Sequence, residues 1–197
     1  MSFRIEEKLY IDTNCLTDFR QWLVTQKIST LYPKRKIRSI YFDNSTSQIF
    51  LDSEEGCVPR RKIRLRNYPD HKDSKFLMET KISSIEGRFK KKEVISNAEK
   101  NKKLNFGIFD IYYGLCKPNL IVEYDREYYD VNNVRLTIDT NIKYSNFDNK
   151  SFSVNDKQII VELKPAIKTS FDFLINKFPF QRIRFSKYCN AYKSLFY

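Results

Sequence analysis

The chain has 197 residues, and its 36 Lys and Arg against 24 Asp and Glu give a formal net charge of +12. This length is typical of one domain with its own core, and the positive charge predicts an anionic partner. The single histidine, His71, and four widely spaced glycines exclude histidine-based catalytic triads and glycine-rich phosphate loops. Any phosphate would therefore be bound by Lys and Arg side chains.

Alternation of polar and apolar residues with period two is the main secondary-structure signal. In chain order it predicts strands over residues 3–11, 37–43, 60–68, 75–82, 87–95, 119–129, 133–140 and 157–164. A helix capped by Thr13 or Asn14 is predicted to run to Lys27, with shorter helices over 46–52, 105–116, 169–178 and 186–196. No repeat or linker interrupts the chain, so the sequence predicts one α+β domain over residues 1–197.

The polar faces of these strands are rich in cations. In residues 60–68, Lys62, Arg64 and Arg66 share one face, whereas Ile63 and Leu65 share the other. If helices cover the apolar faces, the polar faces point either to solvent or into the lumen of a closed antiparallel barrel of about eight strands. The alternation alone leaves both arrangements open.

One polar face from each strand brings together many cations and few anions. The cations are Arg4, Lys8, Lys62, Arg64, Arg66, Lys81, Lys90, Lys92, Arg126, Arg135 and Lys164, and the anions are Glu6, Glu79, Asp139 and Glu162. Two like charges 4 Å apart repel by roughly 4 kcal/mol at the effective dielectric constant of a protein surface. A lumen lined in this way would therefore bind a polyanion several phosphates long.

Several segments resemble, in family order, the polyphosphate-polymerase (VTC) domain family of the triphosphate tunnel, CYTH-like, superfamily. They are RIEEKLYI at 4–11, SIYFDN at 39–44, RRKIRLRNY at 60–68, METK at 78–81, RFKKKEV at 88–94, VEYDREYY at 122–129, VRLTIDT at 134–140, VELK at 161–164 and FSKY at 185–188. The resemblance implies a closed eight-stranded antiparallel barrel, covered by short helices, whose basic lumen binds the triphosphate of ATP and a growing polyphosphate chain.

The resemblance also implies roles for particular residues. Those expected to clamp the transferred phosphates are Arg64, Arg66, Lys81, Arg126, Arg135 and Lys164, and those expected to bind further phosphates are Arg4, Lys8, Lys62, Lys90, Lys92 and Lys187. Arg4 and Lys62 come from the polar-face assignment and not from the resemblance. Glu162, helped by Glu6 or Asp139, is expected to hold Mn²⁺ or Mg²⁺. Among these residues, Lys187 is implied by the resemblance alone, because the polar-face assignment does not include it.

One departure from the superfamily pattern bears on the reaction. Hydrolytic members begin with Glu-x-Glu-x-Lys, whereas this chain has Arg4, Glu6 and Lys8 at those positions. Replacing a metal-binding carboxylate by a cation favours phosphate binding over activation of water. The expected activity is metal-dependent transfer of the γ-phosphate of ATP to polyphosphate or pyrophosphate, a reaction that depends on alignment and electrostatic stabilisation. The acceptor phosphate is already an anion, so no histidine base is needed.

Other interpretations stay open at this point. The chain could hydrolyse tripolyphosphate or nucleoside triphosphates, bind polyphosphate without turnover, or, less favoured, bind nucleic acid. Glu162 could form a structural ion pair, and Glu79 is expected to pair with neighbouring cations. Lys90 and Lys92 could belong to a surface charge run, and Asp139 could orient Arg135.

The cellular setting is predicted from what the sequence lacks. Its four cysteines have no CxxC spacing, which predicts reduced thiols. Neither a signal-peptide pattern nor an apolar run of about 18 residues occurs. These features predict a soluble cytoplasmic protein, with any membrane anchor or regulatory domain supplied by another chain.

Overall fold

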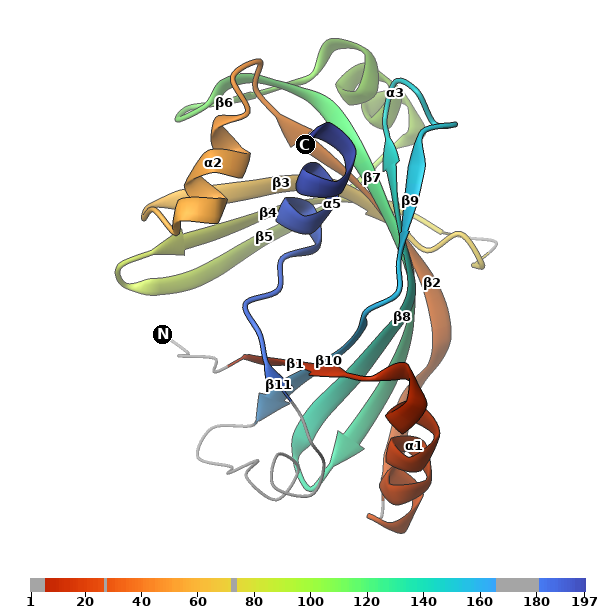
Figure 1. Cartoon of the computed structure of the whole chain (residues 1–197). Helices are drawn as coiled ribbons and strands as arrows, with labels where there is room; N and C mark the ends of the chain where they lie inside the picture. The colour runs from red at the N-terminus through yellow and green to blue at the C-terminus, as the bar shows by residue number, and fades with distance from the viewer. Residues whose placement is uncertain (1–5, 27, 72–73, 166–180) are drawn as a thin grey trace. The chain divides into compact units, whose positions relative to one another are not determined.

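The computed structural model describes residues 6–26, 28–71, 74–165 and 181–197. In chain order the elements are β1 (Glu7–Ile11), a 3-10 turn (Thr13–Cys15), α1 (Leu16–Thr25), β2 (Ser29–Asp43), α2 (Gln48–Glu55), β3 (Arg60–Asn67), β4 (Phe76–Ser84), β5 (Gly87–Ile95), α3 (Asn97–Phe106), β6 (Ile108–Asp110), β7 (Gly114–Val131), β8 (Val134–Asn146), β9 (Ser153–Asp156), β10 (Ile159–Pro165), β11 (Gln181–Arg182) and α5 (Lys187–Phe196) (Figure 1). The expected α+β class is confirmed.

The described strands form an eleven-stranded sheet, not a closed barrel of eight. Its hydrogen-bonded order is β11-β1-β10-β8-β7-β2-β3-β4-β5, with β6 paired to β7 and β9 paired to β8. Within the described residues, β11 and β5 end this order and do not pair with each other. The predicted closed eight-stranded barrel is therefore wrong. A polar strand face has the same sequence pattern in an open and a closed sheet, and β6, β9 and β11 are too short to show alternation.

The chain divides into two compact units. Unit 1 comprises residues 1–35, 124–142 and 156–185, and unit 2 comprises residues 36–123, 143–155 and 186–197. The long strands β2, β7 and β8 contribute residues to both units. None of the helices in the described part of the chain is long and apolar enough to cross a lipid bilayer.

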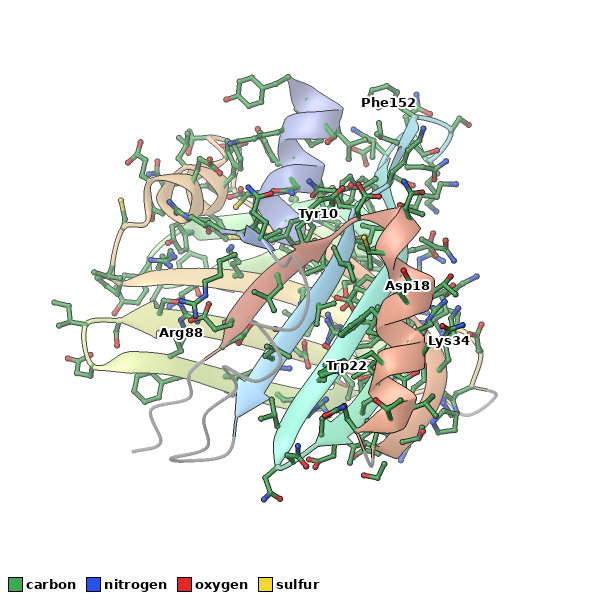
Figure 2. All side chains as sticks on the ribbon, turned by 60° about the horizontal axis from the view of Figure 1, so that its bottom comes forward. Tyr10, Asp18, Trp22, Lys34, Arg88 and Phe152 are labelled. Carbon is green, nitrogen blue, oxygen red and sulfur yellow. The ribbon has the colours of Figure 1, made fainter. Side chains whose placement is uncertain are left out.

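In unit 1, α1 covers one face of the strands. Leu9 and Ile11 of β1 pack with Phe19 and Leu23 of α1 and with apolar residues of β7, β8 and β10 in one buried cluster. Trp22 lies on the side of α1 that faces these strands (Figure 2). Successive side chains of a strand point to opposite faces, so the residues that alternate with this cluster lie on the other face.

In unit 2, β3, β4 and β5 form an antiparallel meander beside two packed helices. Asp43 at the end of β2 accepts hydrogen bonds from the backbone N–H groups of Ile49 and Phe50, which fixes the start of α2. Phe50 then stacks on Tyr192 of α5, with ring centroids 4.0 Å apart. The C-terminal helix, predicted over residues 186–196, is thereby held against α2.

The helix predicted over residues 105–116 is wrong, because the helix lies earlier, at Asn97–Phe106. Ser96 and Glu99 form a capping box at its start. It ends at Gly107, whose φ of +84° disfavours any other residue. Residues 108–116 instead enter the β6–β7 hairpin. The helix predicted over 169–178 lies outside the described residues.

Candidate functional site

In unit 1, a network of charged side chains lies on the strand face that α1 does not cover. The carboxylate of Glu162 lies 3.3 Å from Nη2 of Arg126 and 3.2 Å from Nζ of Lys164. Arg126 also donates two hydrogen bonds to the buried carboxylate of Asp139, at 2.5 and 2.6 Å. Asp139, for which the sequence suggested Arg135 as a partner, therefore fixes the plane of the Arg126 guanidinium.

Glu6 and Lys8 belong to the same network. Nζ of Lys164 lies 3.8 Å from a Glu6 oxygen, and Nζ of Lys8 lies 3.9 Å from the other. Lys8 also donates a 2.7 Å hydrogen bond to the backbone carbonyl of Phe185. Burial alone would raise the pKa of Glu162, but its hydrogen bond with Glu6 and the charges of Arg126 and Lys164 hold that pKa well below its usual range. Glu162 is therefore ionised at neutral pH.

The adjacent carboxylates of Glu6 and Glu162 fit a divalent ion shared with a phosphate ligand. Mg²⁺ prefers oxygen ligands and is commonly held by one or two carboxylates together with substrate phosphates. Among the described residues, no group of three or more His, Cys, Asp or Glu is placed to hold a metal ion. The donor set is thus too small for an all-protein site, yet large enough for a metal–phosphate complex.

Arginine and tyrosine side chains extend the basic face of unit 1. Arg135, opposite Lys164 in the β8–β10 register, is exposed, and its guanidinium lies 5.7 Å from the ring centre of Tyr128. The guanidinium of Arg35 lies 5.1 Å from the same ring and 4.4 Å from that of Tyr32. Sequence analysis missed Arg35, because the predicted strand began at residue 37 and polar–apolar alternation fails over residues 29–36.

In unit 2, Glu79 is the centre of a second charged cluster. The β3–β4–β5 register places it opposite Arg64. Its carboxylate lies 2.6 Å from Arg64, 3.9 Å from Arg66 and 2.5 Å from Lys90. Burial would raise the pKa of Glu79, but the charges of Arg64, Arg66 and Lys90 bring it to about 2. The expectation that Glu79 pairs with neighbouring cations is confirmed.

Three lysines form a row beside this cluster. Lys62, Lys81 and Lys90 occupy directly opposite positions on β3, β4 and β5, so their side chains share one face. Nζ of Lys62 donates to Oγ of Ser186 at 2.8 Å. Burial lowers the pKa of Lys62, and burial together with the charge of Arg64 lowers that of Lys90 to about 8. Like charges directly opposite each other destabilise a sheet, so this row is suited to bind an anion.

Two polar residues of β2 complete the basic face of unit 2. The hydroxyl of Tyr41 accepts a 3.0 Å hydrogen bond from Arg64, and Oγ of Ser39 accepts one of 3.0 Å from Arg66. Burial would raise the pKa of Tyr41, but the charges of Arg64 and Arg66 bring it to about 8. Sequence analysis missed both residues, although polar–apolar alternation over residues 39–43 places them on one face.

The structure thus divides the predicted site residues into two sets. Unit 1 brings together Glu6, Lys8, Arg126, Glu162 and Lys164, with Arg135 alongside, and unit 2 brings together Lys62, Arg64, Arg66, Lys81 and Lys90. Lys92 is exposed on β5 directly opposite Glu79 and so shares the face of the unit 2 cations. Lys187 begins α5 directly after Ser186, the hydrogen-bond partner of Lys62. Arg4 lies outside the described residues.

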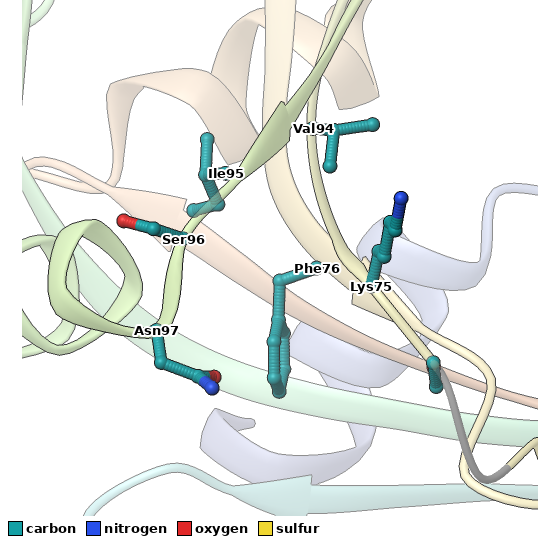
Figure 3. Close-up of a pocket in the computed structure, with 7 residues that line it drawn as sticks. Lys75, Phe76, Val94, Ile95, Ser96 and Asn97 are labelled. Carbon is teal, nitrogen blue, oxygen red and sulfur yellow. The ribbon is translucent and has the colours of Figure 1, made fainter.

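A hollow in unit 2 is chemically unlike these clusters. It has a volume of about 350 Å³ and is lined by Ser74, Lys75, Phe76, Val94, Ile95, Ser96 and Asn97 (Figure 3). None of the predicted site residues contributes to its wall. Its largest side chain is the phenyl ring of Phe76, so it does not resemble a phosphate-binding site.

Comparison with protein families gives a match along almost the whole sequence. The model of the VTC domain matches residues 3–196. The chain belongs to the VTC domain family. The resemblance carried by the short sequence segments is therefore confirmed. Comparison with curated proteins found no significant match.

Solved structures with the fold of this VTC domain are distant in sequence. A candidate adenylate cyclase from Bacillus halodurans is 13% identical, with a TM-score of 0.67, and the match covers 100% of this chain and 98% of that one. A protein from Pyrococcus horikoshii is 16% identical, with a TM-score of 0.62 and coverage of 98% and 99%. A candidate adenylate cyclase from Vibrio parahaemolyticus is 11% identical, with a TM-score of 0.60 and coverage of 98% for both chains. At these identities the likeness concerns the fold.

Proposed function

We propose that this VTC domain, acting as one functional domain, is a polyphosphate polymerase that transfers the γ-phosphate of ATP to a growing inorganic polyphosphate chain. The observation that supports the proposal most is the row of Lys62, Lys81 and Lys90 beside Arg64 and Arg66. Strand pairing holds these cations side by side, where they repel one another. An extended polyanion with a charge on each phosphate relieves that repulsion along the row.

The unit 1 network is assigned to the metal-bound triphosphate of ATP. Glu162 and Glu6 would hold Mn²⁺ or Mg²⁺, and the bound ion would draw charge from the phosphoryl oxygens. Lys164 and Lys8 lie near these carboxylates and would donate hydrogen bonds to phosphate oxygens. Arg126, held by Asp139, presents donors in a fixed plane, which suits phosphate geometry.

Phosphoryl transfer requires these side chains mainly to align the reacting groups and to stabilise negative charge. A terminal oxygen of the acceptor chain or pyrophosphate forms the new P–O bond to the γ-phosphorus. The bond from that phosphorus to the β–γ bridging oxygen breaks, and ADP leaves with the electron pair. Arg126, Arg135 and Lys164 are assigned to stabilise the negative charge that develops on the transferred phosphoryl group. Arg64, Arg66 and Lys81 are assigned to stabilise negative charge along the polyphosphate chain. The acceptor oxygen is already ionised, so no residue has to remove a proton from it.

The proposal is tested by incubating the purified chain with ATP and Mn²⁺ and separating the products on a polyphosphate gel. Long chains together with ADP support the polymerase. Release of orthophosphate without chains identifies a hydrolase, and tight polyphosphate binding without turnover identifies a binding protein. Binding to DNA or RNA in preference to polyphosphate, with loss at high salt, would identify a nucleic-acid-binding module. The proposal places the reaction in the cytoplasm and assigns regulation to a partner protein.

A further inference from the structure

A second surface of unit 2 exposes large apolar side chains within a short segment. Along residues 106–115, the exposed fractions are 71% for Phe106, 75% for Phe109, 76% for Ile111, 61% for Tyr112 and 51% for Leu115. Phe109 and Leu115 are directly opposite each other in the β6–β7 hairpin, and Ile111 and Tyr112 form its turn. We call these five side chains the apolar tip. Single exposed apolar residues are common, but a group of this kind marks an interaction surface.

The hairpin that carries the apolar tip is firmly attached to unit 2. Asp110 forms a 2.9 Å ion pair with Arg61, whose guanidinium lies 4.2 Å from the ring centre of Tyr112. The hydroxyl of Tyr113 donates a 2.7 Å hydrogen bond to Asp52. These contacts hold the hairpin in place while Phe106, Phe109, Ile111 and Leu115 stay exposed. Their exposure is therefore built into the fold.

The charges around the apolar tip are mainly positive. Lys102 and Lys103 line a hollow of about 360 Å³ together with Glu99, Phe106 and Phe109. Lys117 is exposed two residues after Leu115, on the same face of β7.

The acidic residues of this segment are already engaged within unit 2. Glu99 accepts a hydrogen bond from the backbone N–H of Ser96, and Asp110 pairs with Arg61. Beside the apolar tip, Lys102, Lys103 and Lys117 thus outnumber the exposed carboxylate of Glu99.

We propose that the apolar tip and its lysines dock this chain on an anionic lipid bilayer. Phenylalanine and tyrosine side chains at a hairpin turn can enter the interface between headgroups and acyl chains. Lysines around them are attracted to anionic headgroups. A protein partner would more commonly meet a wider surface with an apolar centre, whereas here the apolar groups project from a narrow turn. This docking is independent of the proposed polymerase activity.

The test is flotation of the full chain with vesicles of phosphatidylcholine alone and of phosphatidylcholine with phosphatidylglycerol. We expect binding to the anionic vesicles and little to the neutral ones. The double variant Phe109→Ser/Ile111→Ser should lower binding at least tenfold. It keeps the net charge of the chain, so non-specific attraction of a basic protein would leave its binding unchanged. Ile85→Ser is the matched control, because Ile85 is 86% exposed at the turn between β4 and β5.

The lysine contribution is tested with Lys102→Gln/Lys103→Gln against Lys36→Gln/Lys157→Gln, which removes the same charge at two exposed lysines outside this surface. Each lysine near an anionic surface contributes about 1 kcal/mol, or about fivefold in binding, so the double variant should bind at least tenfold more weakly. In Ile111→Trp, fluorescence should shift to shorter wavelength when anionic vesicles are added.

Equal binding of the wild type and Phe109→Ser/Ile111→Ser would overturn the proposal. So would self-association of the wild type that this variant abolishes, without vesicle binding, because the apolar tip would then join two copies of the chain. Circular dichroism of the same variants shows whether they are folded, and polyphosphate synthesis in solution tests the polymerase separately.

Discussion

The two charged clusters differ in how their charges are balanced. In unit 1, the cations Lys8, Arg126 and Lys164 lie among the carboxylates of Glu6, Asp139 and Glu162. In unit 2, the cations Lys62, Arg64, Arg66, Lys81 and Lys90 share one strand face with the carboxylate of Glu79. Opposite charges are therefore balanced among these six side chains of unit 1, with Arg135 and Arg35 adding positive charge alongside, whereas positive charge is in excess within the unit 2 cluster itself.

The pKa shifts show the same difference. In unit 1 the pKa of Arg126 is raised, because Asp139 outweighs the effect of burial, and that of Glu162 is lowered, so both charged forms are stabilised. In unit 2 burial lowers the pKa of Lys62, and burial with the charge of Arg64 lowers that of Lys90. Tyr41 shifts toward its anionic form. A balanced network is suited to orient groups, whereas an unbalanced one is suited to attract anions.

The largest expected effect comes from neutralising the central carboxylate of unit 1. We expect Glu162→Gln to lower metal-dependent turnover by at least about 100-fold, the usual effect of losing one electrostatic group in an active site. Polyphosphate binding should stay within a few-fold of the wild type, because the cation excess of unit 2 is untouched. Turnover is measured with ATP across a series of Mn²⁺ concentrations. Glu93→Gln is the control, because Glu93 is exposed on β5. Unchanged turnover in Glu162→Gln would contradict the assignment of Glu162 as a metal ligand.

Neutralising the central carboxylate of unit 2 should affect stability instead. Glu79→Gln leaves Arg64, Arg66 and Lys90 without their counter-charge, so we expect a loss of about 3 kcal/mol at neutral pH. The folded-state pKa of Glu79 is about 2, below its ordinary value of 4.5. Its ionisation therefore stabilises the fold above pH 4.5, and this stabilisation is lost as the pH falls toward 2.

Urea unfolding of the wild type and Glu79→Gln over this pH range measures the effect. The difference in free energy of unfolding between them should narrow as the pH falls from 4.5 to 2. Glu93→Gln again provides the control, because Glu93 is exposed on β5. A difference that stays constant with pH would mean that the ion pairs of Glu79 do not support the fold.

The sequence predicts the members of each cluster better than their grouping. Alternation along residues 60–68 places Lys62, Arg64 and Arg66 on one face, because period two follows from strand geometry alone. Whether Lys62 lies beside Lys81 depends on strand register, which pairs residues far apart in the sequence. The division into two units depends on the same long-range pairing. Neither can be derived from periodicity within one strand.

The missed residues have specific causes. Arg35 lies in the part of β2 where Leu31, Tyr32 and Pro33 interrupt alternation, so no strand was predicted there. The helix predicted over 105–116 is misplaced for a different reason. The apolar side chains of this segment are exposed in a β-hairpin and are not buried along one face of a helix. The capping box of Ser96 and Glu99 was the sequence signal for the correct helix start.

A smaller effect is expected when one guanidinium of unit 2 is removed. Arg64→Gln should weaken polyphosphate binding by about tenfold, since a hydrogen bond to a charged group contributes about 1.5–3 kcal/mol. The dependence of binding on salt should also decrease, because one cation fewer faces the polyanion. Lys91→Gln changes the same charge on the opposite face of β5 and should bind as the wild type does. Equal weakening by both variants would mean that polyphosphate binding depends on the overall charge of the protein and not on the position of Arg64.

The smallest effect is a change in the ionisation of Tyr41. Arg64 and Arg66 hold its pKa at about 8, so bound polyphosphate, by adding negative charge beside these cations, should raise that pKa toward its ordinary range. Phenolate absorbance measured against pH, with and without polyphosphate, reports the shift, and subtracting the titration of Tyr41→Phe isolates this tyrosine. Polyphosphate that binds without moving the pKa of Tyr41 would contact cations elsewhere. The positive excess of unit 2 would then have a different role from binding the polymer.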